Sequence, residues 1–237
     1  MYNILMPKEL QVKTTTTKGK HKNIIIFGSP GSGKTTQVDM LKDAGIEFSL
    51  VSVGQILRDL SAKGSPLAAK IEETMSKGDL VDDYTIIRLV KDRMRDIDKS
   101  KMIILDGYPR NLAQVNVVDE IFTEEGLDLP IMINVKISAE EAIKRLSSRR
   151  ICSKCKEVYN LDIDGLKDPT KCPKCGGELV QRHDDKEEVI RNRFEVFDMQ
   201  MEIVTYYFRS KGRYFEINGE KRKENMHKEI MKIIGSR

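Results

Sequence analysis

The chain has 237 residues, enough for one well-buried core with small inserted domains. Its formal net charge of +4 is too mild to indicate a nucleic-acid partner by itself, because polyphosphate ligands also call for positive charge. No apolar run approaches the ~20 residues of a membrane span, and no secretory signal opens the chain, so we expect no membrane partner. All four cysteines fall between positions 152 and 175, which argues against a disulfide framework and favours a cytoplasmic location.

The N-terminal segment, residues 1–23, is rich in lysine and threonine, with four threonines in a row at 14–17. This composition predicts a flexible basic extension. A targeting peptide is the alternative, but the segment lacks arginine, serine and a clear amphipathic stripe.

A phosphate-binding loop follows. The apolar run 24–27 leads into GSPGSGKT at 28–35 and then into a helical pattern, which is the order that a P-loop requires. Glycines let consecutive backbone N–H groups turn toward phosphate oxygens at the positive end of the next helix. We predict a nucleoside triphosphate site in which Lys34 contacts the β- and γ-phosphates and Thr35 ligates Mg²⁺. The residues expected to line it are Gly28, Ser29, Pro30, Gly31, Ser32, Gly33, Lys34, Thr35 and Thr36.

Four more short apolar runs, at 48–52, 102–105, 131–135 and 214–217, alternate with helical patterns that include 67–76 and 84–95. This alternation predicts an α/β fold, a doubly wound parallel sheet of five strands. Ligands of such sheets bind at the carboxyl ends of the strands, where Gly28, Ser52, Asp106 and Asn218 fall. Met199, Met201 and Tyr206 are interpreted as core residues at helical spacing.

Asp106 comes directly after an apolar strand, where a P-loop protein places a carboxylate that holds Mg²⁺ through water. A helix cap or turn is the alternative. Arg145, Arg149 and Arg150 are predicted on one helix, with Arg145 and Arg149 on the same face. A solvated basic face is the alternative interpretation of these charges. Planar guanidinium groups held in place suit the charged oxygens of a transferring phosphoryl group, which favours a role in transfer.

The cysteines form two C-x₂-C pairs separated by sixteen residues. This spacing predicts a closed tetrahedral zinc site formed by Cys152, Cys155, Cys172 and Cys175. Four thiolates leave no open position on the metal, so its role is to hold a small subdomain together. A redox dithiol pair and two disulfides are the alternatives.

From residue 24 onward, the chain resembles adenylate kinases of the long-lid type with a zinc-bearing lid. The resemblance rests on four separated motifs: GSPGSGKTTQ at 28–37, DGYPRNLAQ at 106–114, RLSSRR at 145–150, and RHDD at 182–185 with RNR at 191–193. It implies an enzyme that interconverts ATP plus AMP with two ADP. The cofactors implied are Mg²⁺ with ATP and a structural Zn²⁺. The partners are nucleotides rather than nucleic acid, and a monomer is expected.

The resemblance also implies a division into a core and two moving parts. The core would comprise 24–51, 84–144 and 194–237, the acceptor-binding segment 52–83, and the zinc-binding lid 145–193.

Residue roles are implied in the same way. On the ATP side, Arg145 would stack on the adenine and the loop containing Lys221 would meet it through backbone groups. The residues implied for AMP are Ser52, Val53, Arg58, Asp79, Val81, Gly107, Arg110, Gln114, Arg182 and Arg193. Those implied in catalysis are Lys34, Asp106, Arg110, Arg149, Arg182 and Arg193, with Asp184 and Asp185 orienting lid arginines. Gln114 would hydrogen-bond the adenine of AMP.

One short stretch departs from the family pattern. Where the family usually has Ser-Thr-Gly-Asp, this chain has Ser52-Val53-Gly54-Gln55, which removes a hydroxyl and a carboxylate. These changes leave open a nucleoside monophosphate kinase that accepts CMP, UMP or GMP. A zinc-ribbon nucleotide switch that binds RNA or a protein is the alternative of another class, and salt-dependent RNA binding would identify it.

Overall fold

The computed structural model describes residues 21–62, 64, 66–77, 79–162, 164–182 and 185–235. The segment expected to be a flexible extension therefore lies, through residue 20, outside the described residues. Among the helices of the described chain, none is both long and apolar enough to cross a membrane.

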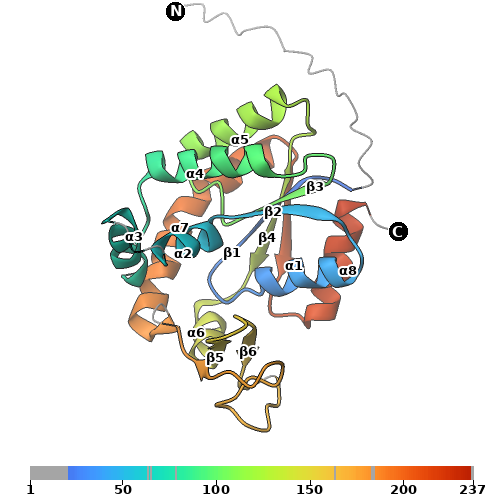
Figure 1. The fold of residues 1–237 in the computed structure, drawn as a ribbon. Coiled ribbons are helices and arrows are strands. Elements are labelled where there is room, and N and C mark those ends of the chain that lie inside the picture. The colour runs from blue at the N-terminus through green and yellow to red at the C-terminus, as the bar shows by residue number, and fades with distance from the viewer. Residues whose placement is uncertain are drawn as a thin grey trace, which may run out of the picture.

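A single parallel sheet forms the centre of the molecule (Figure 1). Its strands lie in the order β2-β3-β1-β4-β8, and every neighbouring pair is parallel. The bounds are β1 (Ile24–Gly28), β2 (Phe48–Ser52), β3 (Met102–Asp106), β4 (Ile131–Lys136) and β8 (Tyr214–Asn218). The predicted α/β class, with five parallel strands at these places, is confirmed.

Both faces of the sheet are buried, as a parallel sheet requires. Ile24 and Ile26 of β1 belong to the hydrophobic cluster on one face, and Ile25 and Phe27 to the cluster on the other. The first cluster includes residues of α1 (Lys34–Asp43) and α8 (Lys223–Ile234). The second includes residues of α2 (Val53–Ser61), α3 (Pro66–Ser76), α4 (Asp83–Asp96), α5 (Leu112–Glu124) and α7 (Glu187–Ser210). Each large side chain buried here stabilises the fold by about 1.5–3 kcal/mol, so the sheet is a firm base for the loops at its edge.

The start of the described chain is attached to this core. Asn23 is buried, its Nδ2 donates to the carbonyl of Asp128 at 2.9 Å, and its Oδ1 accepts from the N–H of Ile103 at 2.9 Å. Lys22 donates its backbone N–H to the carbonyl of Ile234 at 3.2 Å. Contacts to the core thus begin within the last residues of the segment that we expected to be an extension.

The cysteine region forms a second, small sheet below the first in Figure 1. It follows α6 (Ala139–Ser147) and is antiparallel, in the order β6-β5-β7. Its strands are β5 (Arg149–Cys152), β6 (Val158–Asn160) and β7 (Leu179–Val180).

One predicted helix is wrong here. Only Arg145 lies on α6, whereas Arg149 and Arg150 belong to β5. Arg149 pairs with Asn160 and Arg150 with Tyr159 across the β5–β6 ladder. A pairing partner that is distant in sequence therefore decides the backbone conformation, and the four-residue spacing of the arginines does not.

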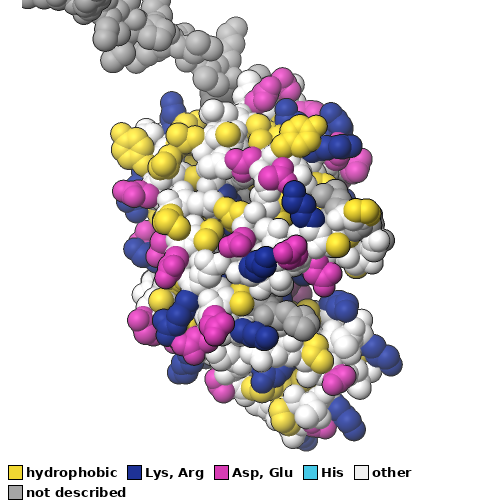
Figure 2. All heavy atoms as spheres, turned by 90° about the vertical axis from the view of Figure 1, so that its left-hand side faces the viewer, with side chains coloured by type: hydrophobic (Ala, Val, Ile, Leu, Met, Phe, Trp, Pro, Cys, Tyr) yellow, Lys and Arg dark blue, Asp and Glu magenta, His cyan; other side chains and the backbone are white. Residues whose placement is uncertain are grey.

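The face of α7 also differs from expectation. Met201 is buried as predicted, but Met199 and Tyr206 are 72% and 74% exposed and are not core residues. Positions 199 and 206 lie on the solvent side of a helix whose core side carries Met201, Val204 and Phe208. On the side of the molecule shown in Figure 2, hydrophobic, basic and acidic side chains are interspersed.

Candidate functional site

The loop between β1 and α1 has the backbone that its glycines predict. Gly31 and Gly33 have φ of 80° and 92°, in the left-handed region that favours glycine. A Cβ atom on Gly28 would come 2.4 Å from the carbonyl oxygen of Val135, so no other residue fits there without displacing β4. The loop can therefore wind tightly against the sheet and leave its N–H groups at the start of α1.

Polar groups of this loop lack partners in the part of the chain that the structure describes. The buried hydroxyls of Ser29 and Ser32 have no hydrogen-bond partner there. The Lys34 Nζ donates to the carbonyl of Ser29 at 3.3 Å, which keeps the ammonium over the loop. Unpaired buried polar groups are costly, so this arrangement suits an anionic ligand that would supply acceptors.

Lys34 lies at the centre of a charged cluster. Its pKa is lowered to about 8, chiefly because burial penalises the ammonium. The nearby Asp106 acts in the opposite direction, and Arg193, Arg110 and Arg149 lower the pKa further by repulsion. The structure thus brings together one carboxylate and four cations that the sequence places far apart.

Asp106 ends β3 beside the end of β2. The two strands are in register at Ser52 and Asp106, and the Ser52 Oγ donates to Asp106 Oδ2 at 2.9 Å. This bond leaves the carboxylate further lone pairs for water or a cation.

Arg110 follows closely in the loop after β3. Its Nε donates to the carbonyl of Gly107 at 3.0 Å, and burial lowers the pKa of its guanidinium while Asp106 opposes that shift. Fixed in this way, a guanidinium can receive a phosphate without reorganising.

Gln114, in the first turn of α5, is only 3% exposed. Its Oε1 accepts from the backbone N–H of Arg110 at 2.8 Å, and its Nε2 donates to Asp83 Oδ1 at 2.7 Å. The Asn111 side chain caps α5 and donates to both oxygens of Asp83. The predicted base-binding amide is therefore held from two sides.

Arg58 lies on α2 and contacts one of the departures from the family pattern. Its Nη2 donates to Gln55 Oε1 at 2.9 Å, and Gln55 Nε2 donates to Asp59 Oδ1 at 2.7 Å. Gln55 thus orients an arginine on its own helix. Val53, the other departure, is buried in the core cluster.

The end of the 52–83 segment touches α7. Asn192 Nδ2 donates to the carbonyl of Lys77 at 2.9 Å and to Asp79 Oδ1 at 3.1 Å. Val81 packs against the core cluster. This contact joins two segments more than a hundred residues apart in sequence.

Two arginines of the predicted lid lie close to a buried carboxylate, Asp185, which is 1% exposed. Arg149 donates to it from Nε at 2.7 Å and a second time from Nη2, and Arg193 Nη1 lies 4.0 Å from it. The orienting role expected for Asp185 thus has a contact that supports it. Arg182 is half-buried nearby in sequence, and Asp184 lies outside the described residues.

Arg145 is held against the loop after β8. Its Nε donates to Glu141 Oε1 at 2.6 Å and its Nη1 to the carbonyl of Gly219 at 2.9 Å. A Cβ on Gly219 would lie 2.6 Å from Ile137 Cγ2, so glycine lets this loop pack on the end of β4. Lys221 pairs with Glu229 at 2.6 Å.

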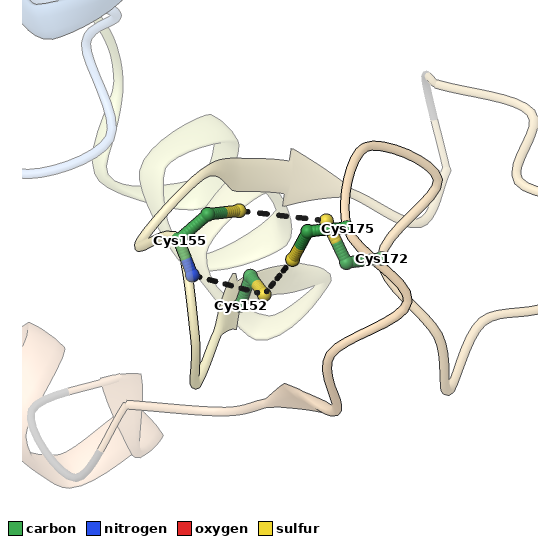
Figure 3. Close-up of side chains that lie close together, drawn as sticks. All are labelled: Cys152, Cys155, Cys172 and Cys175. Carbon is green, nitrogen blue, oxygen red and sulfur yellow. Dashed lines mark hydrogen bonds between the residues drawn. The ribbon is translucent and has the colours of Figure 1, made fainter.

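The four cysteines meet as the spacing predicts. Their sulfurs all lie within 4.8 Å of one another, and all four are free thiols (Figure 3). Thiolates about 2.3 Å from a tetrahedral zinc ion lie about 3.8 Å apart, and the Cys155–Cys172 sulfurs are 3.7 Å apart. The donor set and its spacing fit a structural zinc ion.

The two C-x₂-C turns are built alike. Cys152 and Cys172 each accept a backbone bond from the residue four positions later, Lys156 at 3.1 Å and Gly176 at 2.8 Å. Gly176 has φ of 69°, and Lys156 adopts 61° although it is not a glycine. Neither Lys156 nor Tyr159 belongs to the C-x₂-C pattern, and the Tyr159 hydroxyl lies 3.3 Å from the Cys172 sulfur.

Other contacts were also missed. Of the adjacent Asp82 and Asp83, it is Asp82 that caps α4, accepting from the N–H of Thr85 at 2.9 Å. Asp83 contacts α5 instead, and Asn192 reaches the 52–83 segment. For the contact of Asp83, the sequence carries only the signal of two adjacent aspartates at a helix start. For the contact of Asn192 it carries no signal.

Comparison with known proteins gives one consistent result. The family model described as "Adenylate kinase" matches residues 26–213. The adenylate kinase of Archaeoglobus fulgidus is 42% identical over 212 residues, which cover 90% of this chain and 97% of that protein. Those of Thermosipho africanus and Methanocella arvoryzae are each 39% identical, over 90% and 89% of this chain and 99% and 97% of their own lengths.

Proposed function

The chain belongs to the adenylate kinase family, and we propose that it transfers the γ-phosphoryl group of ATP reversibly to AMP, giving two ADP, in a reaction that requires Mg²⁺. The observation that supports this most strongly is the charged cluster of Lys34, Asp106, Arg110, Arg149 and Arg193. It lies where β1 and β3 end, the edge at which doubly wound sheets bind their ligands.

On the donor side, the loop 28–36 receives the phosphates of ATP. Lys34 contacts the β- and γ-phosphates, and the unpaired hydroxyls of Ser29 and Ser32 lie in the same loop. Arg145 and the backbone of the loop containing Lys221 hold the adenine. The bond from Arg145 to the Gly219 carbonyl supports this pairing of the two elements.

On the acceptor side, Arg58 and Arg110 bind the phosphate of AMP, and Gln114 binds its base. Ser52, Val53, Asp79, Val81 and Gly107 line the pocket. Gln55 accepts a hydrogen bond from Arg58 on the same helix. Although Gln55 lacks the charge of the family's aspartate, it still holds Arg58 in place.

Transfer is direct and in line, without a covalent enzyme intermediate. Bound Mg²⁺ supplies positive charge to the donor phosphates, and Asp106 would hold it through water. Arg149, Arg182 and Arg193 surround the group in transit and stabilise the charge on its equatorial oxygens. Because Asp185 fixes Arg149 and lies near Arg193, these two arginines are held in place before substrate arrives.

Two segments close over the substrates. We place the acceptor-binding segment at 52–83, the lid at 145–193 and the core in the remainder from residue 24. Closure excludes water, which would otherwise accept the phosphoryl group. Cys152, Cys155, Cys172 and Cys175 hold a structural Zn²⁺ that keeps the lid folded. We further propose that the chain works as a cytoplasmic monomer on free nucleotides.

The alternatives find less support. The fixed amide of Gln114 supports adenine as the acceptor base, whereas Val53 and Gln55 leave CMP, UMP or GMP as alternatives to be tested. A switch that binds RNA calls for a basic surface, and on the side shown in Figure 2 basic side chains are mixed with acidic ones.

The test is ADP formation from Mg²⁺-ATP with AMP, CMP, UMP or GMP, each in a separate reaction with zinc-loaded full-length protein. We expect rapid ADP formation with AMP and little with the others. Preferred transfer to another monophosphate would overturn the acceptor assignment. No transfer to any of the four would overturn the proposed reaction.

A further inference from the structure

Gln114 stands at the end of a short chain of hydrogen bonds. Asn111 Nδ2 donates to Asp83 at 2.9 and 2.8 Å, and Asp83 Oδ1 accepts from Gln114 Nε2 at 2.7 Å. Gln114 Oε1 in turn accepts from the backbone N–H of Arg110 at 2.8 Å. These bonds join the start of α4 to the start of α5 through side chains that the sequence motifs leave unconnected.

The chemistry of the two partners fixes which way the Gln114 amide faces. The nitrogen of a side-chain amide offers two N–H donors, and its oxygen offers two acceptor lone pairs. A flip of the amide exchanges the positions of these two atoms. The Asp83 carboxylate only accepts, and the Arg110 N–H only donates. A flipped amide would therefore place two acceptors against each other at Asp83 and two donors at Arg110.

The fixed amide keeps one N–H and one lone pair for a ligand, in a set order. Adenine presents a donor at its exocyclic nitrogen and an acceptor at N1. Guanine presents the reverse, an acceptor at O6 and a donor at N1. A glutamine that could flip would serve both bases, whereas a glutamine held in one orientation fits only one of them.

We propose that Asp83 is a positioning residue that prevents Gln114 from flipping and thereby makes the acceptor site prefer adenine to guanine. The inference rests on the proposed function, because it assigns a role at the acceptor site of that reaction. The burial of Gln114, at 3% exposed, removes the water that would otherwise pair with a flipped amide.

The test is Asp83→Asn, which keeps the size of the side chain but offers a donor as well as an acceptor. Gln114 can then pair with residue 83 in either orientation, so that only the Arg110 N–H still opposes a flipped amide. We expect the ratio of kcat/KM for AMP over GMP to fall about tenfold or more, through a higher KM for AMP and improved use of GMP. The kcat at saturating AMP should change far less, because Asp83 does not contact the reacting atoms.

Asp92→Asn is the matched control. Asp92 lies on the same helix and pairs only with Arg88 and Arg95 in the contacts that the structure specifies, so its loss removes the same charge away from Gln114. It should keep the wild-type ratio. Asp83→Glu retains an acceptor-only group and should keep more of the AMP preference than Asp83→Asn does.

The outcomes separate the inference from the proposed function. An unchanged ratio in Asp83→Asn, or an equal loss for AMP and GMP, would overturn the positioning role. If the wild-type protein transferred to neither acceptor, the reaction itself would be overturned. Calorimetric binding of AMP and GMP to wild type and variant would then still decide the role of Asp83. Asp83→Ser, which also donates and accepts and suits a helix start, replaces Asp83→Asn if that variant does not fold.

Discussion

The sheet core and the proposed zinc lid hold their arginines in different ways. Arg110 follows a strand that is buried on both faces by two large hydrophobic clusters. Among the described residues of the proposed lid, the cysteine segment has a cluster of three buried residues, Cys152, Cys172 and Leu179, and two of them are proposed metal ligands. A cluster this small offsets little of the entropy of ordering the segment, so we expect the lid to depend on a metal cross-link where the core depends on apolar burial.

This difference indicates that the core is the rigid part of the molecule and that the lid is the part able to move. The core fixes the phosphate loop and Asp106, while the proposed zinc ion would keep the cysteine segment folded from within. A lid stabilised within itself can carry Arg149 to the substrates and away again as a unit. Changes to the site, to the metal and to single turns should therefore have separable effects.

The largest effect is expected from Lys34→Ala. Removing the ammonium takes away a charge on the transferring phosphates, and turnover should fall by about 10²-fold or more. Because Lys34 lies among other cations, its loss should leave the melting temperature near that of wild type. Lys42→Ala, on the exposed side of the same helix, is the control and should keep both properties. A Lys34→Ala protein with the wild-type rate of ADP formation would contradict the assignment.

Loss of the metal should act on the lid alone. Either a chelator or Cys172→Ser should abolish most turnover and open residues 150–180 to proteolysis, while amide protection in β1, β3 and β4 persists. Metal analysis should find one zinc ion per chain in wild type. Ser153→Ala changes an exposed residue of the other C-x₂-C turn and should retain both metal and activity. Global unfolding on chelation would show that core and lid are not independent.

A smaller effect concerns pH. The pKa of Lys34 is lowered to about 8 in the free protein, and bound phosphates favour the charged form and raise it toward its ordinary value of about 10.4. Between these two values binding takes up a proton, so the affinity for Mg²⁺-ATP should fall as pH rises above 8 and level off below it. Calorimetry at pH 8.5 in buffers of different ionisation enthalpy measures that proton. Binding without proton uptake at this pH would contradict the lowered pKa of Lys34 in the free protein.

The smallest effect should come from one turn of the lid. Lys156 has φ of 61°, a conformation that costs a non-glycine residue about 1 kcal/mol. Lys156→Gly should therefore stabilise the lid by about that amount against proteolysis. Gly176→Ala, in the matching turn, should destabilise it by a similar amount. Equal protease resistance in both variants and wild type would mean that these turns do not limit the stability of the lid.

Much of this architecture was predictable because its signals are local. The strands that end at Gly28 and Asp106 are contiguous apolar runs, and the spacing of the four cysteines alone indicates that they meet. Arg149 was misplaced because its strand exists only through pairing with Asn160. The exposure of Tyr206 depends on which side of α7 meets the core, and the role of Asp83 on where α4 and α5 meet. Those features are set by tertiary packing, for which a single sequence carries no local signal.

The most direct test compares two rates in one preparation of zinc-loaded, full-length protein. ADP formation from Mg²⁺-ATP and AMP is measured beside ATP hydrolysis without AMP. If the arginines and Lys34 assemble around a phosphoryl group that passes only to AMP, transfer should exceed hydrolysis by about a thousandfold or more. Hydrolysis as fast as transfer, or no transfer at all, would contradict the account.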